Sequence, residues 1–440
     1  MKIERRLGDS EKMFWLLDQA ATINFFIVGR VEGELNPQAV KDALEGLMQM
    51  HPLLSTSLEL RPDGPWLVTN DQLRPALTVM ERENDEHWHG EIEKDMNAPF
   101  DCYTGPLWRV KLLHSPQVSD LLFTFYHPIS DGDSGVYALR DFLTLAANWK
   151  PNTSLVIDHI YPVRPPVEEL LPVAARGWPR FSKTIALMFK QAACNFLDRP
   201  QKLSFTATPR NQRTTKIIPR RLPAETVNRL VAKCREQKTS VQGGLGAAIL
   251  LAIANKIEVK GRLNLSLSSV VNLRRDLNPP LGDEVGLLAS GVSSVHRLRP
   301  TPEFWSLARE VKRDVNKAVA ATEAPITLTL VRYLTPKNAL PDAFAERVTK
   351  IFPYAAVLTN LGRLEIPEQY GALKLTQLHG AVSAKLLAGR EFNLSAATFA
   401  GQMHLNFFYT SPNLAEETVQ EIVNDTLAIL EENLGTVQKS

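Results

Sequence analysis

The chain contains little cysteine and lacks the clusters that bind metals. Only three cysteines occur among 440 residues, at Cys102, Cys194 and Cys234. This odd and scattered set provides neither a disulfide framework nor the paired spacing of a zinc site, and it is typical of a reducing compartment. His87 and His89 would share one face of a strand, but they have no third ligand nearby, so no metal site is predicted.

The sequence also lacks a membrane-spanning segment, a signal peptide and the strong positive charge of a nucleic-acid-binding protein. The most apolar stretch, Gly243 to Ala254, is 12 residues long and too short to span a bilayer. The N-terminus is charged and lacks the apolar core of a signal peptide, so we expect a cytoplasmic protein. A net charge of +2 argues against a nucleic-acid-binding surface.

Length and composition predict a globular protein of two domains. Hydrophobic residues make up 44% of the chain and charged residues 22%, as in ordinary globular proteins, and 440 residues are too many for one core. Prolines recur from Pro151 to Pro209 and should break any long regular element there. We predict an N-terminal lobe over 1–175, an interlobe crossover over 176–210 and a C-terminal lobe over 211–440.

Hydrophobic patterns predict strands and helices in both halves. Strands are expected over 24–32, 55–60, 216–222, 263–270, 353–358, 392–398 and 402–409, and helices over 11–18, 37–50, 224–237, 243–256 and 414–434. Because strands and helices occur in both halves without strict βαβ alternation, the pattern indicates an α+β protein.

Within the crossover, Phe181 to Leu197 is a helix candidate that is apolar on most sides. Basic and aromatic residues, among them Trp178 and Lys190, fringe it. Two interpretations stay open: a helix packed across the lobe interface, or a surface element that meets an acyl chain, a carrier protein or a lipid interface. We expect its apolar side, with Phe189, to border the space between the lobes.

The stretch from Leu121 to Leu143 organises the rest of the chain. Its first part, Leu121 to Tyr126, is an apolar and aromatic run that predicts a buried strand. A helical pattern begins at Ser134. His127 and Asp131 are therefore expected on a short strand-to-helix loop, where rigid elements commonly hold catalytic side chains.

The segment from Tyr126 to Gly132 resembles the HHxxxDG motif of the condensation-domain and acyltransferase superfamily, which is similar in fold to chloramphenicol acetyltransferase. That group includes peptide-synthetase condensation domains, polyketide-associated acyltransferases, alcohol acetyltransferases and wax ester synthases. The first His of the motif is replaced by Tyr126, while the second, which is catalytic in the family, is retained as His127. The Asp-Phe-Gly-Trp-Gly signature of plant acyltransferases is absent, which argues against that branch.

The resemblance covers nearly the whole chain and implies two chloramphenicol-acetyltransferase-like lobes with a tunnel between them. Val271-Asn272-Leu273-Arg274 looks like the family stretch in which an Arg pairs with the motif Asp, so Arg274 is expected to pair with Asp131. Thr359-Asn360-Leu361-Gly362 is similar to the small polar segment beside the family's active-site tunnel.

These residues suggest a division of chemical roles. A neutral imidazole at His127 suits deprotonation of an acceptor, and no Ser or Cys nucleophile motif accompanies it, which favours direct attack over a covalent acyl-enzyme. By resemblance, Asp131 is architectural and is neutralised by Arg274 beside Gly132. Candidate substrate or oxyanion groups are the Gly132 N–H, Tyr126, Thr359 and Asn360.

The sequence therefore predicts a monomeric acyltransferase of lipid or natural-product biosynthesis with no bound cofactor. The donor would be acyl-CoA or an acyl chain on the phosphopantetheine arm of a carrier protein, and the preferred acceptor is a hydroxyl group of a small molecule or lipid. One alternative is a stand-alone condensation enzyme that forms an amide. Another is a non-catalytic module that docks a carrier protein, which Tyr126 favours and which the intact His127 and Asp131 oppose.

Overall fold

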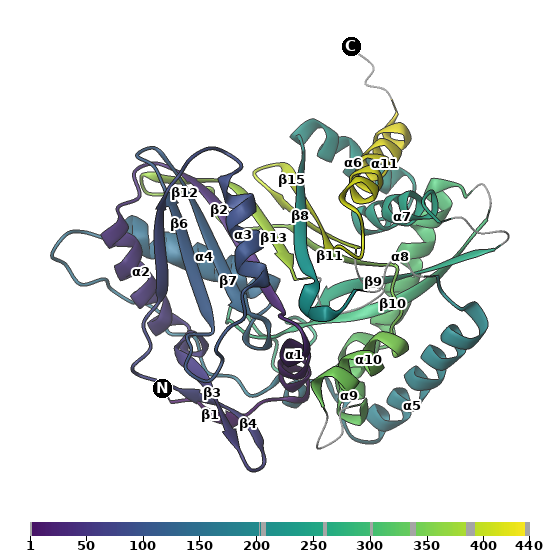
Figure 1. The fold of residues 1–440 in the computed structure, drawn as a ribbon, viewed down its shortest axis with the longest axis horizontal. Helices are drawn as coiled ribbons and strands as arrows, with labels where there is room; N and C mark the ends of the chain where they lie inside the picture. Colours follow the sequence, from purple (N-terminus) through teal and green to yellow (C-terminus); the bar gives the residue numbers. More distant parts are fainter. Residues whose placement is uncertain are drawn as a thin grey trace.

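Two six-stranded sheets and one three-stranded sheet carry the fold (Figure 1). These are the sheets found within the residues that the computed structural model describes, namely 2–201, 203, 208–257, 262–299, 302–334, 340–383 and 392–435. Helices pack on both large sheets, so the predicted α+β class is confirmed.

The first large sheet has the strand order β12-β13-β2-β7-β6-β5, and only its β5–β6 pair is parallel. Its strands are β2 (Asn24–Glu32), β5 (Ala76–Glu81), β6 (Trp108–His114), β7 (Val118–Tyr126), β12 (Gln369–Tyr370) and β13 (Leu373–Val382). Helix α4 (Gly132–Asn148) packs on one face, with α2 (Pro37–Met50) behind it. Helix α3 (His87–Asn97) packs on the other face and also touches β8 (Thr214–Leu222) of the second sheet.

The side-chain alternation of β2 explains why both faces of this sheet are covered. Phe25 and Ile27 point into the core beneath α4, whereas Phe26 and Val28 join a separate cluster with Trp88 of α3. A strand that is buried on both faces is continuously apolar, which is why the sequence located β2 at its observed bounds.

The second large sheet has the order β10-β9-β11-β14-β15-β8. Its strands are β8, β9 (Leu263–Asn272), β10 (Ala289–Leu298), β11 (Ala356–Arg363), β14 (Phe392–Phe399) and β15 (Gln402–Ser411). Strand β11 runs parallel to both β9 and β14, and the other pairs are antiparallel. Helices α6 (Ala224–Glu236), α7 (Val241–Ala254), α8 (Phe304–Ala320) and α11 (Glu416–Leu434) accompany this sheet.

The remaining elements lie around the two large sheets. The small sheet consists of β1 (Glu4–Arg6), β4 (Gly64–Thr69) and β3 (Thr56–Arg61). The remaining helices are α1 (Asp9–Ala20), α5 (Gly177–Ala193), α9 (Glu323–Leu334) and α10 (Pro341–Ile351). Helix α1 contacts α9, α10 and the loop that carries His127, so it bridges the two halves of the chain.

Residues 369–382 depart from the predicted lobe boundaries. The sequence analysis assigns them to the C-terminal lobe, but β12 and β13 extend the first sheet, where β13 pairs antiparallel with β2 from Lys374 to Val382 (Figure 1). The C-terminal half thus contributes the two strands at one side of the N-terminal sheet, so the chain passes from the second sheet to the first and back again. Residues 436–440 of the predicted C-terminal lobe lie outside the described residues.

Two further local predictions are wrong. The shared face considered for His87 and His89 required a strand, but both residues lie in helix α3. The candidate helix in the crossover forms as α5, but Phe189 points to solvent with 72% of its surface exposed. Helix α5 packs against α9 and not between the two sheets.

Candidate functional site

The loop that carries the motif lies between two rigid elements. Strand β7 ends at Tyr126, a short 3-10 turn spans His127–Ile129, and α4 starts at Gly132. The Asp131 carboxylate caps α4 by accepting a hydrogen bond of 2.9 Å from the backbone N–H of Ser134. The loop is therefore held at both ends, as the sequence predicted.

One ring nitrogen of His127 is committed to the loop itself. Its Nδ1 lies 3.0 Å from the carbonyl oxygen of Ser130, which can only accept, so Nδ1 carries the proton in the neutral ring. Among the described residues, no group hydrogen-bonds to Nε2. The imidazole packs against Phe14 and Phe25, with ring centroids at 4.3 and 5.3 Å.

The surroundings of His127 favour the neutral imidazole. Burial lowers the pKa of His127 below its ordinary value, and the carbonyl of Ser130 opposes that shift only in part. At neutral pH the ring therefore has an unprotonated Nε2 that can accept a proton.

Asp131 and Arg274 form the predicted pair and are both fully buried. Arg274 donates from Nη1 to Oδ2 of Asp131 at 3.1 Å and from Nη2 to Oδ1 at 3.2 Å. The backbone N–H of Leu288 donates to Oδ2 at 2.8 Å, and the hydroxyl of Ser134 donates to Oδ1 at 2.8 Å. Burial would raise the pKa of the Asp131 carboxyl, but Arg274 and the Ser134 bonds together hold it below its usual value.

Asp133 is a second carboxylic acid in this motif, and its pKa shifts in the direction opposite to that of Asp131. Burial, and then the neighbouring charge of Asp131, raise the pKa of Asp133 to about 6, although Arg274 acts in the opposite direction. The motif therefore combines an ionised carboxylate with one that titrates close to neutral pH.

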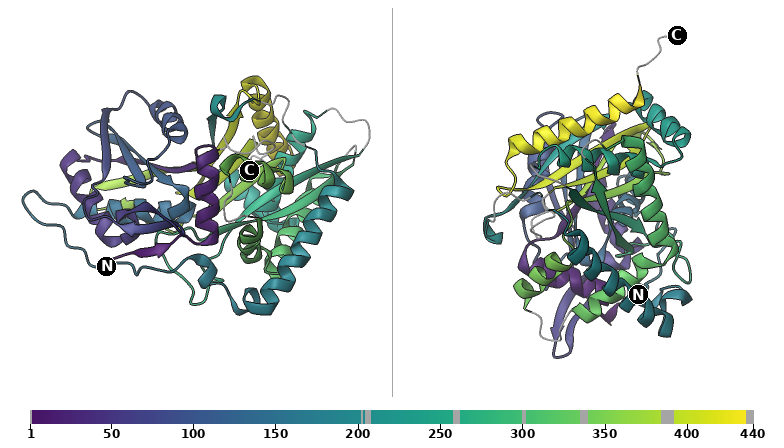
Figure 2. Two further views of the ribbon diagram at one scale, coloured as in Figure 1. Left: turned by 60° about the horizontal axis from the view of Figure 1, so that its bottom comes forward. Right: turned by 90° about the vertical axis from the view of Figure 1, so that its right-hand side faces the viewer.

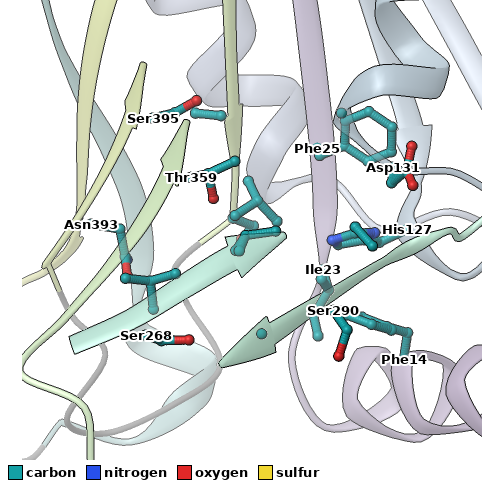
Figure 3. Close-up of a pocket in the computed structure, with 18 of the residues that line it drawn as sticks. Phe14, Ile23, Phe25, His127, Asp131, Ser268, Ser290, Thr359, Asn393 and Ser395 are labelled. Atoms are coloured by element: carbon teal, nitrogen blue, oxygen red, sulfur yellow. The ribbon is translucent and has the colours of Figure 1, made fainter. Parts of the chain in front are cut away.

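His127 borders a cavity of about 280 Å³ that is lined by both large sheets and by α1, α9 and α10. Most of its lining is apolar, including Met13, Leu17 and Ile23. Figure 3 shows His127 and Phe14 on one side of the cavity, with Ser268, Thr359 and Asn393 across from them.

Four polar residues on strands of the second large sheet line this cavity and were not identified from the sequence, whereas Thr359 was. They are Ser268 of β9, Ser290 of β10, and Asn393 and Ser395 of β14. Each lies within a strand, and Asn393 and Ser395 stand two residues apart, so they share one face. A small polar residue inside a buried strand was the available signal.

The structure places the candidate substrate and oxyanion groups differently. Gly132 and Thr359 line the cavity. Tyr126 is fully buried beside Phe100 and is not among the lining residues, so its position gives no support for a role in substrate binding. Asn360 is also absent from the lining, and its Oδ1 accepts a hydrogen bond of 2.9 Å from the N–H of Gly362, which stabilises a local turn.

Two family models match the chain, one in each half. The condensation-domain model matches residues 15–170, and the model of the phthiocerol/phthiodiolone dimycocerosyl transferase C-terminus matches residues 212–410.

The chain is also similar to individual proteins. It is 24% identical over 446 residues to the nonribosomal peptide synthetase kk1B of Curvularia clavata, covering 96% of this chain and 3% of the synthetase. It is 21% identical over 322 residues to the phthiocerol/phthiodiolone dimycocerosyl transferase of Mycobacterium bovis, covering 70% of this chain and 71% of that protein.

A solved structure with the same fold is the trichothecene 15-O-acetyltransferase of Fusarium sporotrichioides. It superimposes with a TM-score of 0.75 at 12% identity, covering 98% of this chain and 95% of that one. At this identity the likeness is one of fold.

Proposed function

Because the chain belongs to the condensation-domain and chloramphenicol-acetyltransferase-like acyltransferase superfamily, we propose that it transfers an acyl group from a thioester donor to a hydroxyl acceptor. The observation that carries the proposal is the state of His127: a neutral ring whose Nδ1 is bonded to Ser130 and whose Nε2 is left available beside an apolar cavity. A base in this state can activate an acceptor without a covalent acyl-enzyme.

The proposed reaction proceeds in two steps. Nε2 of His127 takes the proton of the acceptor hydroxyl while the acceptor oxygen attacks the thioester carbonyl. The tetrahedral intermediate then collapses, the carbon–sulfur bond breaks, and the imidazolium returns its proton to the leaving thiolate. The hydrogen bond between Nδ1 and Ser130 keeps the ring in the required orientation throughout.

Gly132 and Thr359 are the proposed donors to the oxyanion. Gly132 is the first residue of α4, where a backbone N–H has no partner within the helix, and the positive end of the helix dipole favours negative charge. The hydroxyl of Thr359 approaches from the opposite wall. Asp131 and Arg274 are positioning residues in this scheme: Asp131 lines the cavity, but its carboxylate is bonded to Arg274, Ser134 and the backbone of Leu288, which holds the start of α4.

The proposed donor is acyl-CoA or an acyl carrier protein, and no bound cofactor is required. The apolar lining supplied by α1 and α10 suits the acyl chain, and the tunnel expected from the family would admit donor and acceptor from different sides. One relative is a phthiocerol/phthiodiolone dimycocerosyl transferase, and the solved structure of the same fold is an O-acetyltransferase, which favours an oxygen acceptor. The likeness to a nonribosomal peptide synthetase keeps amide formation as the second candidate.

The test is release of free thiol from acyl-CoA and acyl-carrier donors across a panel of alcohols and amines. His127→Ala should lower turnover by about 10²–10⁴-fold, the usual contribution of a general base. His159→Ala is the matched control, because His159 is exposed on the connection between the sheets and should leave turnover unchanged. If no donor and acceptor pair reacts, or if His127→Ala retains full turnover, the proposed function is wrong and a docking module takes its place.

A further inference from the structure

Helix α5 and the π-helical turn that follows it, Cys194–Asp198, present large apolar side chains to solvent. Trp178 is 77% exposed, Phe189 72%, Phe196 71% and Leu197 72%. Folded proteins rarely expose so many large apolar side chains together, and a contiguous apolar patch marks an interaction surface. Helix α5 lies at the outer edge of the molecule in Figure 1 and in the left-hand view of Figure 2.

The exposed residues lie on one side of the helix because of their spacing. They are Trp178, Phe181, Ile185, Met188, Phe189 and Phe196, which recur at intervals of three, four or seven residues. Thr184, Leu187 and Gln191 occupy the opposite side and are buried. The pattern is therefore inverted relative to an ordinary surface helix, since the larger apolar side faces outward.

Polar contacts on the inner side fix this orientation. Lys190 forms an ion pair of 2.7 Å with Glu323, and Lys183 donates to the hydroxyl of Thr322 at 3.1 Å. The outward direction of the apolar side is thus set by the protein's own contacts, and the face is built as a surface.

Charge identifies the partner. The segment from Gly177 to Leu197 contains no Asp or Glu, while five basic residues border or belong to the helix: Arg176, Arg180, Lys183, Lys190 and Arg199. Arg176, Lys183 and Lys190 bond to neighbouring protein groups, whereas Arg180 and Arg199 form no ion pair with the described residues and are the cations left for a ligand. A helix with bulky apolar residues on one side and cations along its flanks lies in the interface of an anionic bilayer. We propose that α5 docks the protein onto an anionic lipid membrane, parallel to its surface.

The geometry favours this partner over a protein. None of the described helices is long and apolar enough to cross a bilayer, so α5 would lie on the membrane and not span it. A protein interface combines its apolar core with hydrogen-bonding groups. Among the exposed residues of α5 from Trp178 to Phe189, in contrast, only Ser182 is polar. An apolar face with cations nearby fits a bilayer, in which the apolar side chains can enter the acyl region and the cations can meet the anionic headgroups.

Docking there would also place the membrane near the catalytic cavity. Lys190 and Gln191 of α5, and Asn195 of the turn after it, line a second cavity of about 600 Å³. Tyr354 lines both that cavity and the one beside His127. The membrane-facing helix therefore flanks a cavity that borders the proposed acyl site.

Vesicle binding tests the proposal, and it requires neither donor nor turnover, so its outcome is independent of the proposed acyl transfer. The full chain should co-float with phosphatidylcholine vesicles that contain about 30 mol% phosphatidylglycerol and bind pure phosphatidylcholine far more weakly. Phe189→Gln combined with Phe196→Gln should lower binding at least about tenfold, because the apolar contact with lipid is lost. Leu60→Gln combined with Val156→Gln alters two residues that are 62% and 74% exposed elsewhere and should bind like the parent.

Two further variants separate charge from apolar contact. Arg180→Gln and Arg199→Gln should each lower affinity for anionic vesicles about fivefold and leave the weak binding to neutral vesicles unchanged. Brominated lipid chains should quench tryptophan fluorescence in the parent, and Trp178→Phe should bind equally well but lose most of that quenching.

Several outcomes would overturn the proposal. Absence of vesicle binding by the parent, or equal binding by the Phe189 and Phe196 variant, would show that α5 is not a membrane surface. If sedimentation shows a parent dimer that this variant abolishes, the face covers a second copy of the chain. If an acidic carrier protein binds the face while vesicles do not, the partner is a protein.

Discussion

Arg274 and Asp131 are 143 residues apart in the sequence and meet through two buried hydrogen bonds of 3.1 and 3.2 Å. The same carboxylate caps α4 and accepts from the backbone of Leu288, so a single side chain connects the motif loop, α4 and the segment before β10. The relationship gives Asp131 a structural role that can be separated experimentally from the catalytic role proposed for His127.

Removing either partner should destabilise the protein. Asp131→Ala and Arg274→Ala each leave an uncompensated buried charge, which costs about 3–5 kcal/mol. Because the two changes remove one interaction, the double variant should lose less free energy of unfolding than the sum of the single variants. Urea unfolding of the four proteins measures this coupling.

Asp131→Asn is the informative control, because an amide oxygen can still cap α4 but carries no charge. It should lie between the parent and Asp131→Ala in free energy of unfolding. Strict additivity of Asp131→Ala and Arg274→Ala would show that the pair contributes no interaction energy.

The rate should depend on pH through His127. Burial lowers the pKa of His127 below its ordinary value of 6.5, so the ring loses its neutral form only in more acidic solution. The profile of kcat/KM against pH should therefore be flat near neutrality and fall on the acid side with a midpoint below 6.5. A midpoint above 6.5 would mean that the ring is not desolvated in the working enzyme, or that another group is the base.

Asp133→Asn should stabilise the protein at neutral pH. The raised pKa of Asp133, about 6, means that the folded state holds this proton more tightly than the unfolded state does. Stability therefore falls as pH rises from the unfolded pKa toward the folded one, and the ionised carboxylate is a net cost above about pH 6.

The gain from Asp133→Asn should accordingly be larger at about pH 7.5 than at about pH 5, measured as the shift in melting temperature against the parent. An identical shift at both pH values would show that the carboxyl titrates normally.

Local sequence signals predicted the elements that local interactions determine. The hydrophobic pattern predicted helix α2 at its observed bounds, and local contacts explain its start: Pro37 stands in the first turn and Asn36 Oδ1 accepts from the N–H of Gln38 at 2.8 Å. The motif loop was located because an aromatic strand is followed directly by a capped helix. These features need no knowledge of distant residues.

Long-range pairing was not predictable in the same way. Strand β13 pairs with β2 across more than three hundred residues, and its mixture of buried and exposed positions resembles no clear strand pattern. The sequence suggested Asn360 as an active-site residue. Gly362, two residues later, has a left-handed backbone at φ +72°, and in this turn the Asn360 side chain accepts a hydrogen bond from the N–H of Gly362. The cavity wall opposite His127 depends on such pairings, which is why Ser268, Asn393 and Ser395 were missed although Thr359 was found.

The contact between α4 and the first sheet gives the last prediction. A Cβ atom added at Gly135 would lie 2.6 Å from Cγ1 of Ile27, closer than real Cβ contacts, and 3.1 Å from Cε2 of Phe25, which is tight. Gly135→Ala should therefore push α4 away from β2, at a cost of about 1–3 kcal/mol from overpacking. The better helix propensity of alanine offsets roughly 0.5–1 kcal/mol of that cost.

Because α4 carries Asp131 as its cap and Gly132 at its start, this shift should lower turnover as well as the free energy of unfolding. Gly90→Ala is the matched control, since Gly90 is also helical, in α3, and a Cβ there would have no neighbour within 4 Å. This control should gain about 0.5–1 kcal/mol and keep its turnover. Urea unfolding measures the free energy of unfolding, and thiol release measures turnover. If the Gly135→Ala protein is as stable and active as the Gly90→Ala protein, the contact between α4 and the sheet is not tight and the prediction is wrong.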